Sequence, residues 1–410
     1  MSLSEIIVQK YGGSSVATSQ KIMDIAEIVK KRVLDGNKMA VVVSAMGKTT
    51  DGLLKLAGEV ANNPIPREVD MLLATGEQVT SALLALALND KGIPAVSRNA
   101  FQLGIVTSSN YSNARIVDMD LQQLEEDFKT YEVVVITGFQ GVTEEGDLTT
   151  LGRGGSDTSA VAIAAKAGAK CEIYSDVAGV YTTDPNVIKG AKKLDAITYD
   201  EMLELAALGA KVLHSRAVEL AKIYDVPLYC GATFSDEKGT FIMKNLPEWL
   251  EHPVVTGVTV ARNQIKFSLV CMNNGDTALS KLFHALADNY VNVDMISTAM
   301  GGKEKKEVFI TFSVIDSPIG GKSAKEVTAQ TVRNCLGVEP DFEEAVKVSA
   351  VGVGMNSASG VASRYFNALN KCGVEILGVT TSEIKISVLV KIEQAEMALK
   401  ALVDEFELAQ

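Results

Sequence analysis

The segment Thr149–Ala160, with the sequence TTLGRGGSDTSA, combines residue types that bind anions. It follows an apolar run at Val133–Ile136 and precedes a helical pattern that begins at Ala160, which predicts a strand, a loop and a helix. Glycines let the backbone approach a ligand, and Ser156 and its polar neighbours are favourable N-cap residues. Because a helix start binds anions and Arg153 can form a two-pronged bond to a carboxylate or phosphate, this segment predicts an anion site. Taken alone, a plain glycine-rich turn explains it equally well.

A second loop of the same design lies near the N-terminus. The apolar run Ile6–Gln9 predicts a short strand, and the loop Lys10–Val16 (KYGGSSV) follows it before the pattern of an amphipathic helix. Gly12 and Gly13 can present backbone N–H groups, and Lys10 adds one point charge. Together these groups favour phosphate binding.

A third loop follows the run Met39–Ser44, which is apolar throughout, as strands buried on both faces of a parallel sheet are. The nearby residues Gly47–Thr49 resemble the end of the P-loop of nucleoside triphosphatases. That loop also requires a glycine where this chain has Val42, so a P-loop enzyme is excluded. Ser44, Thr50 and Asp51 remain as polar groups after the strand, where open α/β sheets bind ligands.

Two predicted helices carry further candidate groups. The segment Glu68–Leu88 predicts one apolar helix with a carboxylate, Glu77, in its middle. That carboxylate either lies on the surface or faces a cleft, and the spacing leaves both interpretations open. The segment Glu201–Tyr224 predicts another helix, on which we expect His214 to be a packed or capping residue.

Strands and helices alternate from residue 6 to about residue 245, which predicts a largely parallel sheet covered by helices on both faces. The strand Cys171–Ser175 is followed by Asp176 and a glycine-bearing loop, and Val226–Cys230 is predicted to be the last strand. Since the carboxyl ends of parallel strands meet at one edge of a sheet, we expect all these loops to converge there.

Composition limits the class of protein. The 410 residues suffice for two or three domains, and 47% hydrophobic with 22% charged residues is typical of a soluble globular protein. The net charge of -12 argues against general affinity for nucleic acid or anionic membranes. The five cysteines form no CxxC pair, so we expect buried thiols in a cytoplasmic protein and no disulfide or metal site. We expect neither an export signal nor a membrane span.

The C-terminal part changes character after Pro253 and contains two copies of one unit. Residues match without gaps at a constant offset of 83, as Leu286 does with Leu369 and Val293 with Ile376. Each copy predicts a strand, a loop, a helix and two further strands. A unit too small to bury its own sheet usually pairs with its copy, so we expect the two copies to pack together.

In combination, the motifs resemble those of the bacterial aspartate kinases. In chain order they read KYGGSSV at 10–16, SAMGKTTD at 44–51, TLGRGGSDT at 150–158, YSDVAGVYTTDP at 174–185 and GAKVLH at 209–214. The resemblance covers essentially the whole chain, because the two repeats are similar to the paired ACT domains of the monofunctional enzymes. It implies the amino acid kinase fold, a mostly parallel eight-stranded α/β sandwich, over residues 1–245, followed by α+β ACT domains at 254–335 and 340–410.

The resemblance also implies an activity. The family transfers the γ-phosphate of ATP, which carries Mg²⁺, to the β-carboxylate of L-aspartate and gives 4-phospho-L-aspartate, the first step of lysine, threonine and methionine biosynthesis. By resemblance, Lys10 stabilises the transferring phosphoryl group, Asp157 organises the site around Lys10, and Arg153 holds the α-carboxylate of aspartate. The other implied substrate contacts are Ser44, Thr50, Glu77 and Ser156. The implied nucleotide contacts are Lys10, Gly12, Gly13, Ser175, Asp176, Tyr181, Lys211 and Val212. Asn186 stands where the family often has an arginine, so one charge near the nucleotide is missing.

The same resemblance implies regulation by an end-product amino acid, lysine with or without threonine, bound at the helix-start loops of the ACT pair. Both loops depart from the common family sequences, since the first lacks a Pro-Gly pair and the second a His-Pro pair. The candidate effector contacts are Asn274, Asp276, Thr277, Asn356, Ser357, Val361 and Thr381. Because open sheet edges tend to pair, we expect at least a homodimer through the ACT domains.

Two alternatives remain open on the residues alone. The first is another amino acid kinase, acting on glutamate, N-acetylglutamate or UMP, and the paired repeats and the TLGRGGSD motif argue against it. The second is a catalytically silent amino-acid sensor. Its kinase domain would have no need of Lys10, Arg153 and Asp157 together, so their presence argues against it.

Overall fold

The computed structural model describes residues 3–207, 212–246, 253–272, 275–301, 307–315, 318–319, 322–355 and 358–410. The chain forms two compact units. Unit 1 comprises Met1–Thr182 and Lys192–Glu251, and unit 2 comprises Thr183–Ala191 and His252–Gln410. The finer boundaries predicted from the sequence, at 1–245, 254–335 and 340–410, stay predictions.

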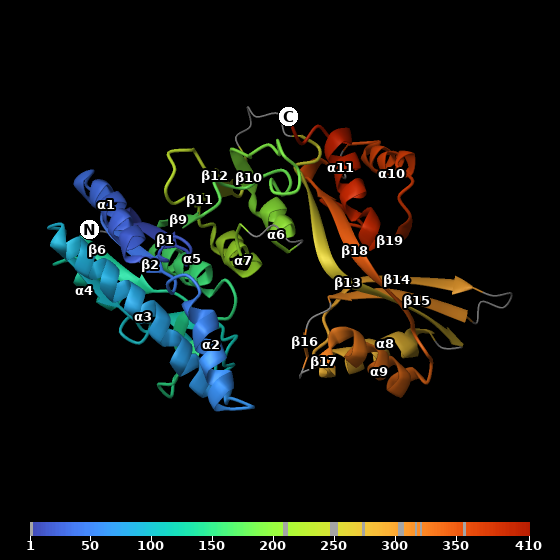
Figure 1. The fold of residues 1–410 in the computed structure, drawn as a ribbon, viewed down its shortest axis with the longest axis horizontal. Coiled ribbons are helices and arrows are strands. Elements are labelled where there is room, and N and C mark those ends of the chain that lie inside the picture. Colours follow the sequence, from blue (N-terminus) through green and yellow to red (C-terminus); the bar gives the residue numbers. More distant parts are fainter. Residues whose placement is uncertain are drawn as a thin grey trace. The chain divides into compact units, whose positions relative to one another are not determined.

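Unit 1 is built on an eight-stranded sheet in the order β10-β12-β11-β9-β1-β2-β6-β3 (Figure 1). Every neighbouring pair is parallel except β11 with β12. This confirms the predicted sheet, although β12 follows the strand that was expected to be the last. The strands are β1 (Ile7–Tyr11), β2 (Met39–Val43), β3 (Ala95–Arg98), β6 (Val133–Thr137), β9 (Lys170–Ser175), β10 (Ala196–Thr198), β11 (Leu228–Ala232) and β12 (Thr240–Met243).

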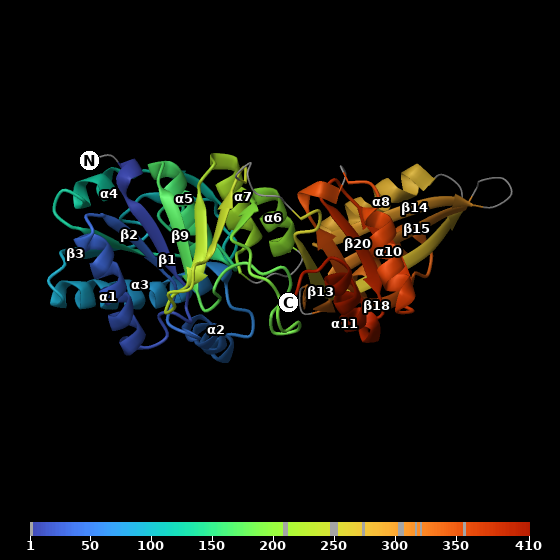
Figure 2. The ribbon, with the colours of Figure 1, turned by 90° about the horizontal axis from the view of Figure 1, so that it is seen from above.

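Helices cover both faces of this sheet, and β2, β1 and β9 lie side by side at its centre (Figure 2). Apolar residues of α1 and α3 form one core with β1, β2 and β6. On the other face α5 packs against β1 and β9, and α7 packs against α5. The helices of unit 1 are α1 (Ser19–Leu34), α2 (Thr49–Val60), α3 (Pro66–Asp90), α4 (Gln122–Asp127), α5 (Gly155–Ala167), α6 (Tyr199–Ala207) and α7 (Ser215–Tyr224), with a 3-10 turn at Leu3–Glu5.

A smaller sheet that the sequence did not predict as a whole lies beside the main one. Its order is β5-β4-β7-β8, and it brings the loop before β5 next to the end of β8. Its strands are β4 (Ile105–Thr107), β5 (Ile116–Met119), β7 (Gln140–Val142) and β8 (Leu148–Thr150).

Two helix predictions need correction. The central helix α5 begins at Gly155 rather than at Ala160, with Gly154 at its N-cap position in the left-handed conformation (φ 68°). The polar residues after Gly154 therefore lie in the first helical turns and do not cap the helix. The segment 201–224 is not one helix, because α6 ends at Ala207 and His214 is the N-cap residue of α7.

Unit 2 contains one six-stranded sheet in the order β14-β15-β13-β18-β20-β19. Each copy of the predicted repeat gives the expected strand, helix and two strands, followed by a further helix that was not predicted. The first copy has β13 (Gly257–Met272), α8 (Gly275–Asp288), β14 (Val293–Gly301), β15 (Glu307–Ile315) and α9 (Ala324–Leu336). The second has β18 (Asp341–Val351), α10 (Val361–Lys371), β19 (Ile376–Thr381), β20 (Lys385–Val390) and α11 (Ala395–Glu405), and short pieces are β16 (Pro318–Ile319), β17 (Lys322–Ser323) and 3-10 turns at Val353–Met355 and Ile392–Gln394.

The long strand β13 belongs to both copies. It pairs with β18 from Gly257 to Ser268 and with β15 from Gln264 to Met272, with a bulge in the β18 pairing between Ala261 and Gln264. Its first half packs into the core of the second copy through Val258, and its second half packs into the core of the first copy. The two copies therefore share one sheet and one strand.

The short segment Thr183–Ala191 also belongs to unit 2. Ile188 packs against the core of the second copy, and the Gln410 N–H donates to the Gly190 carbonyl oxygen at 2.9 Å. Asn186 bonds through its backbone and side-chain nitrogens to Asp184, at 2.9 and 3.0 Å. The residue that replaces a common arginine thus stabilises a local turn.

The cysteines are only in part buried as the sequence predicts. All five cysteines are free, and Cys171, Cys230 and Cys271 are buried as predicted, whereas Cys372 is exposed. Burial raises the pKa of the Cys171 thiol well above its ordinary value.

Among the described residues, α3 is the one helix long and apolar enough to cross a membrane, and half of its most apolar stretch is buried in the protein. Because the core helices of soluble proteins pass the same test, this is weak evidence for a membrane span.

Candidate active site

A cavity of about 440 Å³ opens at the carboxyl end of β1 and β2. It brings together residues from loops that are far apart in the sequence, as predicted from the topology of a parallel sheet. Eight of the predicted site residues line it: Lys10, Gly13, Ser44, Thr50, Glu77, Arg153, Ser156 and Asp157.

Lys10 and Asp157 form an ion pair within this cavity. The Lys10 Nζ lies 2.6 Å from the Asp157 Oδ1, and each side chain is 11% exposed. Lys10 is part of β1 rather than of the following loop, and Asp157 lies in the first turn of α5. Because a strand and a helix hold the two groups, the ammonium is fixed in place with one side open to the cavity.

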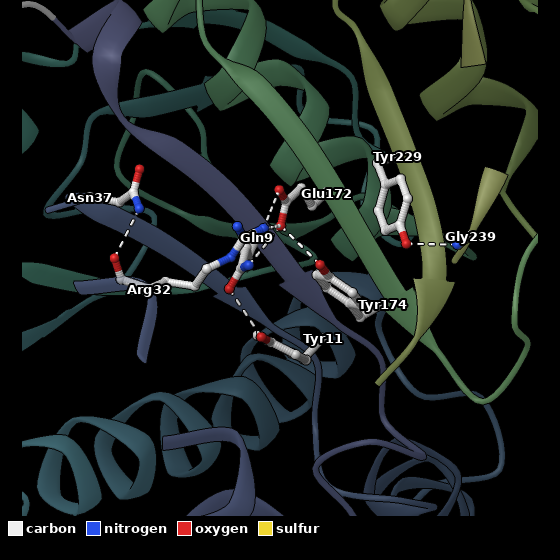
Figure 3. A network of polar contacts seen from close by, with 8 residues as sticks. All are labelled: Gln9, Tyr11, Arg32, Asn37, Glu172, Tyr174, Tyr229 and Gly239. Atoms are coloured by element: carbon white, nitrogen blue, oxygen red, sulfur yellow. Dashed lines mark hydrogen bonds and ion pairs between the residues drawn. The ribbon is translucent and has the colours of Figure 1, made fainter. Parts of the chain in front are cut away.

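The neighbours of Lys10 anchor β1 from the opposite face of the sheet (Figure 3). Successive side chains of a strand point to opposite faces. The Gln9 Nε2 donates to Glu172 at 2.7 Å, and the Tyr11 hydroxyl donates to Gln9 at 3.0 Å. Arg32 of α1 donates to both carboxylate oxygens of Glu172, at 2.6 and 2.8 Å. Burial raises the pKa of Tyr11, which stays a neutral donor.

The start of α5 lies at the cavity, and this is the segment whose TLGRGGSD motif predicts an anion site. Gly154, Gly155, Ser156 and Asp157 all line the cavity, so the N-terminal end of this helix faces it. The positive end of the helix dipole favours an anion there. Arg153 precedes these residues, lines the same cavity and is exposed, so its guanidinium is free to meet a ligand.

The loops after β1 and β2 come into close backbone contact beside the cavity. A Cβ atom at Gly13 would lie 2.9 Å from the Ala45 carbonyl oxygen, so only glycine fits without displacement. The Gly47 N–H donates to the Gly13 carbonyl oxygen at 3.0 Å. The glycine of the first loop therefore lets the loops after β1 and β2 meet.

Glu77 is an acid of the cavity whose side chain is buried and whose pKa is raised. It is 3% exposed, its Oε1 accepts from the Ala45 N–H at 3.0 Å, and its Oε2 is buried without a hydrogen-bond partner. Burial raises the pKa of Glu77 to about 7, against the opposing effect of the Ala45 N–H. The carboxylate faces the cavity, which resolves the alternative left open by the sequence. An unpartnered buried oxygen of this kind is suited to receive a cationic ligand group.

Of the predicted nucleotide contacts that the structure describes, Lys10 and Gly13 line the cavity, and Gly12, Ser175, Asp176, Tyr181 and Val212 do not. The Gly12 N–H donates to the Tyr174 carbonyl oxygen at 3.1 Å, which joins the first loop to the end of β9 just before Ser175 and Asp176. Tyr181 forms an isolated bridge with Lys193, and Val212 is half-buried ahead of α7. Lys211 lies outside the described residues.

The candidate effector contacts fall in unit 2. Thr277 is exposed in the first turn of α8, Val361 is buried at the start of α10, and Thr381 is exposed at the end of β19. Asp276 is part of α8. Asn274, Asn356 and Ser357 lie outside the described residues.

Asp51, which the sequence places with Ser44 and Thr50 among the polar groups after the strand, also lines the cavity. Two further lining residues, Ser112 and Phe139, were missed by the sequence reasoning. Ser112 belongs to a polar loop without a motif, and its left-handed backbone (φ 66°) leaves no trace in its residue type.

Comparisons with known proteins identify the family to which this site and fold are similar. Residues 5–231 match the amino acid kinase family, and residues 348–406 match an ACT domain. The chain is 44% identical over 407 residues to the aspartokinase of Geobacillus stearothermophilus, covering 99% of this chain and 98% of that one. It is 43% identical over 408 residues to aspartokinase 2 of Bacillus subtilis, with 99% and 98% covered.

Solved structures give the same result. The fold is similar to that of E. coli aspartokinase III in complex with aspartate and ADP (R-state), with a TM-score of 0.80, 25% identity and coverage of 98% of this chain and 99% of that chain. The same enzyme in complex with lysine and aspartate (T-state) matches with a TM-score of 0.74, 25% identity and coverage of 98% and 100%.

Proposed function

This chain belongs to the amino acid kinase family and, within it, to the aspartokinases, and we propose that it transfers the γ-phosphoryl group of ATP to the β-carboxylate of L-aspartate. The observation that carries the proposal is the convergence of Lys10, Arg153 and Glu77 on one cavity. Two positive groups and one carboxylate match the charges of an amino acid with a second carboxylate that must meet a triphosphate.

The reaction needs charge neutralisation more than proton transfer. The β-carboxylate of aspartate is already ionised at neutral pH, so no general base is required. The obstacle is repulsion between this anion and the triphosphate, which preorganised positive groups reduce. We assign this role to Lys10, held by Asp157 at 2.6 Å, together with the N–H groups at the start of α5 and the N–H of Gly13.

The amino acid is oriented by its two other charged groups. Arg153 would bind the α-carboxylate through a two-pronged bond. The buried Oε2 of Glu77 would receive the α-ammonium, and Ser44, Thr50 and Ser156 would complete the contacts. Holding the nucleophile in line in this way lowers the entropic part of the barrier.

Nucleotide binding would use the sheet edge next to the cavity, with Gly12, Gly13, Ser175, Asp176, Tyr181, Lys211 and Val212 as contacts. Mg²⁺ would arrive with ATP as part of the nucleotide substrate. Its charge neutralises the phosphates, and it keeps most of its ligands from phosphate and water. Among the described residues, no group of three or more His, Cys, Asp or Glu could hold a metal by itself.

A coupled assay for ADP release tests the proposal. We expect turnover that depends on L-aspartate and not on glutamate, N-acetylglutamate or UMP at the same concentration. Turnover with only one of the other acceptors would show that the protein has another amino acid kinase activity. Absence of turnover with every acceptor would favour a silent sensor.

The pH dependence of aspartate binding follows from Glu77. Its pKa of about 7 means that the group is ionised above pH 8 and largely protonated below pH 6. A protonated Glu77 cannot pair with the α-ammonium, so kcat/KM for aspartate should fall about tenfold per pH unit below 7. Measured at saturating ATP, Glu77→Gln should have a raised KM for aspartate and a flat profile in this range. A parent profile flat from pH 5.5 to 8 would contradict the assignment.

Regulation would act through unit 2. We propose that an amino acid, lysine with or without threonine, binds at the starts of α8 and α10 and prefers an inactive arrangement. The complex of E. coli aspartokinase III with lysine supports this class of effector. We expect inhibition at millimolar lysine or threonine, relative to glycine at equal ionic strength. Unchanged activity with lysine, threonine and methionine would remove the hypothesis.

We further propose that the enzyme works in the cytoplasm and forms at least a homodimer.

A further inference from the structure

Two chain segments meet at the wall of the cavity. They are Ser112–Ala114 and Thr150–Gly152, and the Ala114 N–H donates to the Thr150 carbonyl oxygen at 2.9 Å. Ser112, Thr150 and Gly152 line the cavity, and the second segment runs directly into Arg153. The position of Arg153 therefore depends on what holds these two segments together.

Asp70 of α3 holds them from the side of their N–H groups. Its side chain is fully buried, and its Oδ2 accepts from the backbone N–H groups of Ser112 and Thr150 at 2.8 and 2.7 Å. Its Oδ1 accepts from the hydroxyls of Thr150 and Ser112 at 2.8 and 3.2 Å. All four of these donors are uncharged and all belong to the two segments, so the carboxylate serves as a common acceptor for both.

Arg216 of α7 holds the same segments from the side of their carbonyl groups. Its Nη1 donates to the Leu151 oxygen at 2.9 Å, and its Nη2 donates to the Ala114 oxygen at 2.7 Å. The guanidinium is half-buried, and burial lowers its pKa. The rigid fork of arginine can bind two carbonyl oxygens at once, which a lysine ammonium at the end of a flexible chain does poorly.

The helix that carries Asp70 also carries Glu77, two turns further along the same buried face. One rigid element thus fixes both the carboxylate proposed to bind the ammonium of the substrate and the anchor of the segment that presents Arg153. Neither Asp70 nor Arg216 lines the cavity.

We propose that Asp70 and Arg216 are positioning residues, which hold Arg153 at a set distance from Glu77 and thereby select the length of the amino acid that binds. The inference rests on the proposed function, since it takes Arg153 and Glu77 as the two substrate contacts. A chain longer by one methylene, as in glutamate, would have its second carboxylate displaced from Lys10. Misplacement of reacting groups by about 1 Å costs up to about 10²-fold in rate.

Asp70→Asn tests this with little change in shape. The amide oxygen can still accept from both backbone N–H groups, and the amide nitrogen can donate to the two hydroxyls. The variant should therefore fold, but its bonds lose the charge that makes them about twice as strong. We expect the KM for aspartate to rise about tenfold, the KM for ATP to change less than twofold, and the preference for aspartate over glutamate in kcat/KM to fall.

Arg216→Lys is the second variant, because it keeps the charge while losing one of the two carbonyl contacts, and it should shift the same quantities in the same direction. Asp127→Asn is the matched control. Asp127 is a buried carboxylate of unit 1 that binds Arg98 at 2.6 and 2.8 Å and does not line the cavity. Its substitution should lower the melting temperature without changing substrate preference.

The outcomes separate this inference from the proposed function. An unchanged KM for aspartate in folded Asp70→Asn and Arg216→Lys overturns it. So does an equal rise in both KM values with unchanged preference, as for a purely structural role. Arg153→Ala is measured in parallel. If Arg153→Ala raises the KM for aspartate and the two positioning variants do not, this inference fails alone; if Arg153→Ala has no effect, the substrate assignment fails and the inference falls with it.

Discussion

Replacing Lys10 with alanine should lower kcat by about 10²–10³-fold, the loss that follows removal of one preorganised electrostatic donor. Lys10 lines the cavity with its ammonium 2.6 Å from Asp157, and the surrounding strand and helix keep it there without reorganisation. Turnover at saturating aspartate and ATP measures the effect, and circular dichroism checks the fold. Full activity in Lys10→Ala would be incompatible with the mechanism.

A matched control and a double variant sharpen this prediction. Lys38→Ala removes a lysine that precedes the neighbouring strand β2, bonds to the Phe128 carbonyl oxygen and does not line the cavity, so its activity should be unchanged. Asp157→Ala should be nearly inactive as well. When two residues act as a unit, the effects of substituting them on the rate are not additive. The double variant Lys10→Ala with Asp157→Ala should therefore lose little more activity than either single variant. Multiplied losses would mean that the two groups act independently.

Replacing Arg153 with alanine should raise the KM for aspartate by about 10–100-fold, as expected for one lost charge-assisted contact of about 1.5–3 kcal/mol. The side chain is exposed in the absence of substrate, so the fold should not change. Arg153→Lys should recover only part of the affinity, because an ammonium cannot form the two-pronged bond. Initial rates over a range of aspartate concentrations give the measurement.

The control for Arg153 is Arg67→Ala. Arg67 is an exposed arginine at the start of α3 that pairs with Asp147, and it does not line the cavity. It should leave both KM values within twofold of the parent. If Arg153→Ala instead raised the KM for ATP alone, Arg153 would belong to the nucleotide site and the orientation of aspartate proposed here would be wrong.

Much of the cavity could be predicted from the sequence, because its residues follow strands whose order and direction the alternation of elements predicts. Lys10 and Ser44 stand at or just beyond the ends of β1 and β2, and a parallel sheet brings such positions to one edge. Arg153 follows β8 of the smaller sheet, so this rule alone does not place it. The start of α5 was placed five residues late. The polar residues after Gly154 pack inward around the cavity, so they lack the apolar periodicity that marks a helix.

The positioning residues could not be predicted for a different reason. Asp70 and Arg216 bind mainly backbone groups, and every residue type except proline offers the same N–H and C=O. No partner residue therefore marks them in the sequence. The four strands of the smaller sheet in unit 1 were not predicted to form a sheet, because strands of three or four residues are too short to show alternation.

The long strand β13 has a consequence for how unit 2 unfolds. Its first half lies in one core and its second half in the other, and it pairs along its length with strands of both copies. Melting either copy would strip a neighbour from this strand and leave an open hydrogen-bonding edge. Calorimetry of the full chain should therefore record the two copies losing structure in a single cooperative step, and excising one of them should leave the other prone to aggregate.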